Sequence, residues 1–273
     1  MAHHDDAKPR RMISLLTDFG LMDPYVAEMK AIILTTCPEA ITIDISHLVE
    51  KFNIRMGAFL LASAVPAFPA GSVHLAVVDP GVGSKRRPIV IETRRNLYVG
   101  PDNGLLVPAA HAEGILSVYE VTNHQLMRGN ISSTFHGRDI FAPVAAHLAT
   151  GVPPRDCGPG ISDYMNPPYS QPKLEEKKAS CEVFHIDAFG NIITNLRGTD
   201  ISKWNLNLAQ KLRISMENKR TSALYVKTYS ELRKGEIGLL VGSHGFLEIS
   251  CRENSAARRI KARTGMAVQI SNA

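Results

Sequence analysis

The sequence has few cysteines, no long apolar run and none of the common catalytic motifs. Its four cysteines are scattered and never spaced as CxxC, which argues against a structural zinc site and favours free thiols: Cys37, Cys157, Cys181 and Cys251. No apolar stretch approaches the roughly 20 residues that span a bilayer. Residues 1–11 also lack the apolar core of a signal peptide. We therefore expect a cytoplasmic protein with no membrane partner.

The missing motifs argue against several enzyme classes. The sequence contains no Walker A loop and no GxGxxG, HExxH or GxSxG pattern. A DFG triplet is present at residues 18–20, but in a kinase it follows a glycine-rich loop, a strand lysine and a catalytic-loop aspartate. Only 17 residues precede Asp18, so the triplet does not indicate a kinase.

Charge of one sign does not dominate either. The net charge is +5, and 44% apolar with 21% charged residues is typical of a soluble globular protein. The basic residues lie in short, separate clusters: Arg86-Arg87, Arg94-Arg95 and Arg258-Arg259. This pattern slightly favours acidic small molecules, and we expect no nucleic-acid partner.

Two kinds of pattern divide the 273 residues. Residues 11–165 alternate strand-like runs with helix-like segments, which predicts an α/β domain with a mostly parallel sheet and flanking helices. The helix-like segments are 23–37, 54–68 and 140–151, and Asp23 is a candidate cap for the first of them. Residues 166–179, rich in proline and charge, are predicted to be a linker. Residues 180–273 are short runs broken by Gly, Asn and charges, which predicts an all-β barrel or sandwich.

Four polar clusters lie at predicted strand ends or turns, where ligands bind in open α/β sheets. They are Asp18 after the first strand, Asp79 to Arg86 in DPGVGSKR, Phe135 to Asp139 in FHGRD, and the DAFGN and GSHG segments at residues 187–191 and 242–245.

Each cluster also has a purely structural explanation. Asp18 and DPGVG could form plain turns, and DAFGN and PDNG (101–104) could be hairpin turns. Arg138 and Asp139 could be an ion pair, and His136 a hydrogen-bonded structural histidine. The residues alone leave both explanations open.

The order of five motifs indicates a family. TDFG, VVDPGVGSKRRP, YVGPDNGLL, STFHGRDIFAPVAAHLA and IDAFGNIITN follow one another along the chain. Together they resemble the S-adenosylmethionine (SAM) hydrolases that form adenosine, also called SAM hydroxide adenosyltransferases, which are relatives of fluorinase and chlorinase. The resemblance implies an α/β N-terminal domain, a C-terminal β-barrel, and a homotrimer. Its substrate sites would lie between the N-terminal domain of one subunit and the C-terminal domain of a neighbour.

The resemblance also implies roles for individual residues. The catalytic set that orients the attacking water would be Asp79, Arg86 and His136, although Arg87 adjoins Arg86 and only alignment chooses between them. Asp18 would hold the ribose hydroxyls, and Phe52 lies where the halogenating relatives carry a Trp. The remaining substrate-binding positions are Asp187, Asn191 and Ser243 for the amino-acid part, Asn254 and Ala256 for adenine, and Phe135, Gly137 and Phe189.

The chemistry of SAM suits such a site. Its sulfonium leaves as a neutral thioether, so catalysis reduces to placing water in line with C5′ and accepting its proton, without a cofactor or metal. Arg86 would supply positive charge, and either Asp79 or His136 would be the base. Asp79, Val82 and Gly137 replace the Tyr, Thr and Ser of fluorinase, and a carboxylate there would repel halide.

We therefore predict hydrolysis of SAM to adenosine and L-methionine. The alternatives are a SAM-dependent halogenase that forms 5′-halo-5′-deoxyadenosine, and a non-catalytic protein that binds SAM or adenosine.

Overall fold

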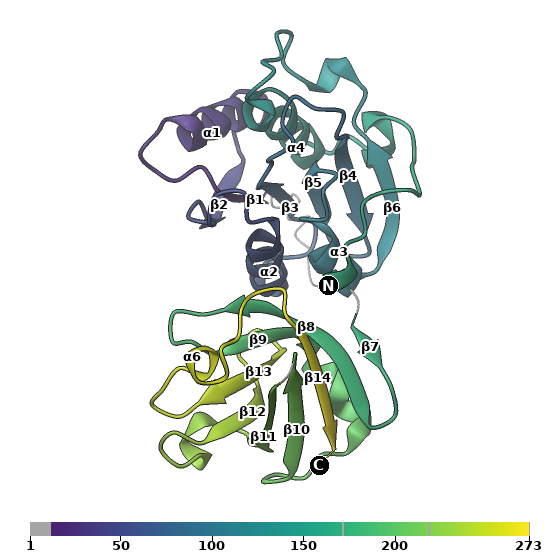
Figure 1. Ribbon diagram of the computed structural model, residues 1–273. Helices are drawn as coiled ribbons and strands as arrows, with labels where there is room; N and C mark the ends of the chain where they lie inside the picture. The colour runs from purple at the N-terminus through teal and green to yellow at the C-terminus, as the bar shows by residue number, and fades with distance from the viewer. Residues whose placement is uncertain (1–11, 171, 218, 273) are drawn as a thin grey trace, which may run out of the picture. The chain divides into compact units, whose positions relative to one another are not determined.

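A computed structural model describes residues 12–170, 172–217 and 219–272. The predicted domain limits at residues 11 and 273 lie outside this range. The chain divides after Pro167 into two compact units, each with its own core (Figure 1). The predicted boundaries, 11–165, 166–179 and 180–273, stay predictions; β7 (Lys173–Leu174) and the start of β8 fall inside the range predicted as a linker.

The first unit is built on a six-stranded sheet with the order β2-β1-β3-β5-β4-β6. Its strands are β1 (Met12–Thr17), β2 (Ile41–Ser46), β3 (Val73–Val77), β4 (Pro88–Thr93), β5 (Leu97–Pro101) and β6 (Ile115–Glu120). The β1–β2, β1–β3 and β3–β5 pairs are parallel, and β4 is antiparallel to both neighbours. Three residues join β4 to β5, which is too short for a parallel crossover.

Helices cover both faces of this sheet. Helix α1 (Tyr25–Thr36) packs against α4 (Ala142–Ala149), and α2 (Ile54–Ala64) packs against α3 (Val107–Glu113) (Figure 1). On β1, Ile13 and Leu15 join the core beneath α1 and α4, whereas Leu16 lies toward Gly57 of α2. Such two-sided burial explains why these strands read as continuous apolar runs.

Local predictions in this unit were partly wrong. Helix α1 begins after Pro24 and has no side-chain cap, so Asp23 is not its cap. The PDNG segment leads from β5 toward α3 and is not a hairpin turn. Both α3 and β6 are elements that the sequence patterns did not indicate.

The second unit is a β-barrel. Its strands are β8 (Lys178–Ile186), β9 (Ile192–Arg197), β10 (Lys211–Met216), β11 (Lys219–Tyr225), β12 (Ile237–Val241), β13 (Phe246–Cys251) and β14 (Ala267–Asn272). They run in the order β14-β10-β11-β12-β13-β9-β8, and β14 also pairs with β8, which closes the sheet. Only two short α-helices interrupt the described strands, α5 (Gly198–Ile201) and α6 (Ala256–Ile260). The predicted fold class, an α/β unit followed by an all-β barrel, is confirmed.

No helix within the described ranges is both long and apolar enough to cross a membrane.

Candidate functional site

Asp79, Arg86 and His136 form one hydrogen-bonded set in the first unit. Arg86 Nε donates to Asp79 Oδ1 and Oδ2 at 3.0 and 2.9 Å, and its Nη2 donates to Oδ2 at 2.5 Å. The same Nη2 lies 2.9 Å from His136 Nδ1. The side chains of Arg86 and Asp79 are 9% and 5% exposed, so water screens this pair weakly.

A tight turn brings Arg86 back to Asp79. Ser84 N–H donates to the Gly81 carbonyl at 3.0 Å. Gly83 has φ +75°, and a Cβ there would lie 2.5 Å from the Ser133 carbonyl oxygen. Glycine is therefore required both by the backbone angle and by the close approach of the segment that leads to His136.

The arginine determines which nitrogen of His136 can accept. A guanidinium only donates hydrogen bonds, so Nδ1 is the acceptor and the proton of the neutral ring sits on Nε2. Burial lowers the pKa of His136, and the charge of Arg86 lowers it further. Arg86 Nη1 is buried and has no hydrogen-bond partner within the described residues.

Asp79 and His136 open onto a cavity of about 240 Å³. Its walls are largely aromatic, because Phe19, Tyr25 and Phe135 meet there edge to face with centroids 5.1–5.9 Å apart. Val77, Val82, Thr134 and Gly137 complete the lining. The cavity thus combines a charged, water-excluded wall with flat apolar surfaces.

Arg87 is directed away from this set. It pairs with Asp102 at 2.7 Å and with Asp163 at 2.8 Å. The ion pair considered for Arg138 and Asp139 is present at 2.7 Å. Burial alone would raise the pKa of Asp139, but hydrogen bonds from Arg138, Ser132 N–H and Arg128 hold it below its usual value.

Asp18 lies directly after β1 and is buried. Its Oδ2 accepts a hydrogen bond from Phe52 N–H at 2.8 Å, and its carbonyl accepts one from Lys51 Nζ at 2.5 Å. The Phe52 side chain is 68% exposed and its backbone is left-handed, with φ 64°. Because Phe19 contacts Phe135, Asp18 lies next to a wall of the cavity.

His47 supports the Asp18 loop, although no motif pointed to it. Its Nδ1 lies 2.8 Å from Thr17 Oγ1, which accepts a hydrogen bond from Phe19 N–H. Its carbonyl accepts one from Gly20 N–H at 2.8 Å. Asp44 lies 3.1 Å from Nε2. The only sequence signal for His47 was its place just after a strand.

The second unit brings together the DAFGN loop and the start of α6. Asp187 Oδ1 accepts from the N–H groups of Phe189 and Asn191, and Oδ2 accepts from Asn191 Nδ2, all at 2.9 Å. Gly190 accepts from Ala257 N–H at 2.9 Å. A Cβ at Gly190 would overlap Ser255 Oγ, and φ is +82°, so glycine suits this contact.

The other predicted positions in the barrel differ in exposure. Phe189 is 82% exposed, and Ser243 and Asn254 are exposed. The side chain of Ala256 is fully buried, so only its backbone could face a ligand. The predicted site residues therefore form two groups, one in each unit: Asp18, Phe52, Asp79, Arg86, Phe135, His136 and Gly137 in the first, and Asp187, Phe189, Asn191, Ser243, Asn254 and Ala256 in the second.

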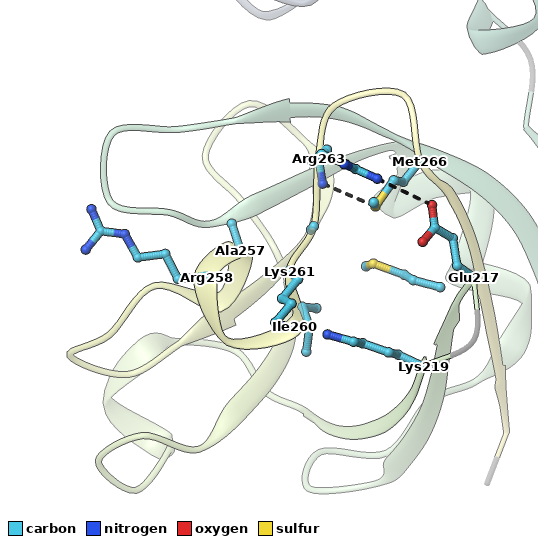
Figure 2. Close-up of a pocket in the computed structure, with 10 residues that line it drawn as sticks. Glu217, Lys219, Ala257, Arg258, Ile260, Lys261, Arg263 and Met266 are labelled. Carbon is cyan, nitrogen blue, oxygen red and sulfur yellow. Dashed lines mark hydrogen bonds and ion pairs between the residues drawn. The ribbon is translucent and has the colours of Figure 1, made fainter.

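A larger cavity of about 550 Å³ lies beside α6 and contains none of the predicted site residues (Figure 2). Its charged side chains are exposed, with Glu217 at 62% and Arg263 at 79%, and they are 3.9 Å apart. It is an open surface hollow rather than a buried polar site, and we assign no chemistry to it. No group of three or more His, Cys, Asp or Glu among the described residues could hold a metal ion.

The chain is similar to known proteins along most of its length. Models of the SAM hydroxide adenosyltransferase N-terminal and C-terminal domains match residues 13–158 and 181–269. An (R)-S-adenosyl-L-methionine hydrolase from Salinispora tropica is 38% identical over 266 residues, which cover 96% of this chain and 98% of the relative. A fluorinase from Nocardia brasiliensis is 27% identical over 292 residues, which cover 96% of this chain and 97% of the relative.

A solved structure has the same fold. It is that of an uncharacterized conserved protein from Thermotoga maritima, with a TM-score of 0.86 and 37% sequence identity, and the match covers 96% of this chain and 100% of that one. Together with the two domain matches, these similarities show that the chain belongs to the SAM hydroxide adenosyltransferase family.

Proposed function

We propose that the protein hydrolyses SAM to adenosine and L-methionine. The observation that carries the proposal is the hydrogen-bonded set of Asp79, Arg86 and His136 at the wall of an aromatic cavity. The hydrolase relative is named for the (R) epimer of SAM, and we propose the same epimer as the substrate here.

The reaction requires one nucleophile and one proton acceptor. The water oxygen bonds to C5′ as the C5′–S bond breaks, and the bonding pair returns to sulfur, which becomes the neutral thioether of methionine. The attacking water becomes acidic as its oxygen donates electrons to carbon. A weak base within hydrogen-bond reach is therefore sufficient to take its proton.

We assign that base to Asp79. With Nδ1 occupied by Arg86, neutral His136 presents only an N–H at Nε2, which can orient the water but cannot accept its proton. Asp79 is an acceptor at the same cavity wall. Arg86 keeps the carboxylate oriented and offsets its charge, and its unused Nη1 is a further donor.

Substrate binding divides between the two groups of residues. We propose that Asp18 accepts hydrogen bonds from the ribose hydroxyls, and that Phe52, Phe135 and Gly137 pack around the sugar. The DAFGN loop and Ser243 bind the amino-acid part, with Phe189 beside it. The backbone from Asn254 to Ala256 binds adenine. No cofactor or metal has a step in this mechanism.

We also propose a homotrimer in the cytoplasm, with a neighbouring subunit covering the Asp18 region. Large apolar side chains around Asp18 are exposed: Leu21 at 67%, Met22 at 100%, Leu48 at 69% and Phe52 at 68%. Exposed apolar clusters of this kind mark interaction surfaces.

The proposed location in the cytoplasm rests on the cysteines. All four are buried and free, as suits a reducing compartment. Sedimentation velocity tests the trimer, and cell fractionation tests the location.

The function is tested by product analysis in ¹⁸O-water. Hydrolysis predicts methionine and adenosine that carries the label at O5′. A 5′-halo-5′-deoxyadenosine formed in the presence of chloride would indicate a halogenase instead. SAM binding without any product would indicate a non-catalytic binding protein. Adenosine without label would exclude direct attack of water on C5′.

A further inference from the structure

The barrel contains a buried carboxyl group that the mechanism above does not use. Glu248 of β13 is 7% exposed. Its neighbours Leu247 and Ile249 belong to the barrel core, so Glu248 points to the opposite face of the strand. Its Oε2 accepts a hydrogen bond from the Tyr229 hydroxyl at 2.8 Å. Within the described residues, Glu248 has no lysine or arginine partner.

Glu248 lies against the turn that carries Ser243. The Gly242 backbone packs directly against its carboxyl group. The negative charge of Asp187 acts on both Glu248 and Tyr229, and the charge of His244 also acts on Glu248. Glu248 therefore shares one small region with two segments proposed to bind the amino-acid part of SAM.

The charges in this region are not balanced. Burial raises the pKa of Glu248; the hydrogen bond from Tyr229 and the charge of His244 oppose this rise, and Asp187 adds to it. Burial, Glu248 and Asp187 together raise the pKa of Tyr229 to about 12. A cation placed here would stabilise the carboxylate form of Glu248 and relieve its repulsion by Asp187.

Asp187 is largely occupied by its own loop. Its two oxygens accept three hydrogen bonds from Phe189 and Asn191, which hold the DAFGN turn. Glu248 accepts one hydrogen bond, from Tyr229. A carboxylate has about four acceptor positions, so Glu248 retains more capacity for a ligand than Asp187 does.

We infer that Glu248 is a specificity residue that holds the α-ammonium group of the methionine part of SAM, beside Asp187. The inference rests on the proposed function, because it takes SAM as the ligand. Asp187 then acts mainly by holding the DAFGN loop in shape. The carboxylate of Glu248 on β13 supplies the negative charge that selects a ligand with an α-ammonium group.

The test compares SAM with its analogue in which a hydroxyl replaces the α-ammonium. Glu248→Gln keeps the size of the side chain and an acceptor for Tyr229 but removes the charge. A charged hydrogen bond of this kind corresponds to about a 10- to 100-fold effect. We expect kcat/KM for SAM to fall by about that factor, while kcat/KM for the hydroxy analogue stays nearly unchanged.

Glu231→Gln is the matched control, because Glu231 lies in the same short helical turn as Tyr229 but is exposed. It should leave both substrates unaffected. If Glu248→Gln slows both substrates equally, Glu248 has only a structural role and the inference is wrong. If the wild-type protein forms no product, the proposed function fails. Calorimetry with L-methionine and its 2-hydroxy analogue then tests Glu248 separately.

Discussion

At the scale of single residues, Arg86 and Arg87 are adjacent in sequence but have different partners. Both follow the same glycine-rich turn, yet Arg86 bonds Asp79 and His136 whereas Arg87 bonds Asp102 and Asp163. The sequence could place an arginine in the cluster but could not choose between two adjacent ones, because the choice depends on partners up to 76 residues away. Glu248 and His47 were missed for a similar reason: each is a single polar residue outside any motif.

The proposed catalytic roles of Asp79, Arg86 and His136 make a kinetic prediction. Asp79→Asn, Arg86→Ala and His136→Ala should each lower kcat, by roughly 10²- to 10⁴-fold, with SAM affinity close to that of the wild type. If the three side chains act together on the attacking water, as proposed, a double variant should be little slower than the worse single variant. Single-turnover rates and calorimetric affinities for SAM check this. A rise in Kd that matches the fall in kcat would mean that the set binds substrate rather than activating water.

His74 makes a prediction about acid stability. It is fully buried on β3 with Nδ1 2.7 Å from Ser14 Oγ, and burial, followed by the charge of Arg95, lowers its pKa to about 3. Between about pH 6.5 and pH 3, the unfolded chain therefore binds a proton at His74 that the folded protein does not bind. The free energy of unfolding consequently decreases as the pH falls through that range.

His74→Asn removes the titrating ring. Its cost in unfolding free energy should be about 2 kcal/mol smaller at pH 5 than at pH 7. Urea denaturation at both pH values measures the difference. An equal cost at the two pH values would show that His74 does not control acid stability.

At the scale of elements, the patterns predicted most strands and the long helices. The strand-like runs of the first unit became β1 to β5. Of these, β1, β3, β4 and β5 are largely buried because both faces of this sheet are covered, whereas β2 is largely exposed. Helix α3 was not predicted because its seven residues continue an apolar run and do not show the helical spacing of apolar and polar residues. The DAFGN segment was open to two interpretations. It is a hairpin turn between β8 and β9, held by hydrogen bonds to Asp187, and its role in binding stays a proposal.

The turn at Gly83 makes a prediction at this scale. Gly83→Ala would place a methyl group against the Ser133 carbonyl and also force a left-handed backbone. It should separate the Asp79 and His136 segments, lowering kcat by at least 10-fold and stability by more than the ~1 kcal/mol of backbone strain alone. Gly71→Ala is the control, because Gly71 has φ +82° but open space around it. Equal losses from the two variants would show that the close approach at Ser133 does not matter.

At the scale of the whole molecule, the proposed trimer predicts complementation between defective subunits. By the proposed roles, Asp79→Asn should disable the half of the site in the first unit, and Asp187→Ala should disable the half in the second unit. If each site takes one unit from each of two neighbouring subunits, mixed trimers contain sites whose two halves are both intact. Random mixing of equal amounts should then restore about one quarter of the wild-type activity in a closed head-to-tail ring. Activity no higher than that of the separate variants would place each site within a single subunit.

The closure of the barrel has a consequence for synthesis on the ribosome. Strand β14 pairs with both β8 and β10, so two strand edges stay open until it has emerged. Open edges are where nascent chains aggregate. The first unit needs no strand from the second, and it can fold while the barrel is still being translated. Messages that end before residue 267 should therefore yield products with a folded first unit and an open, protease-sensitive barrel.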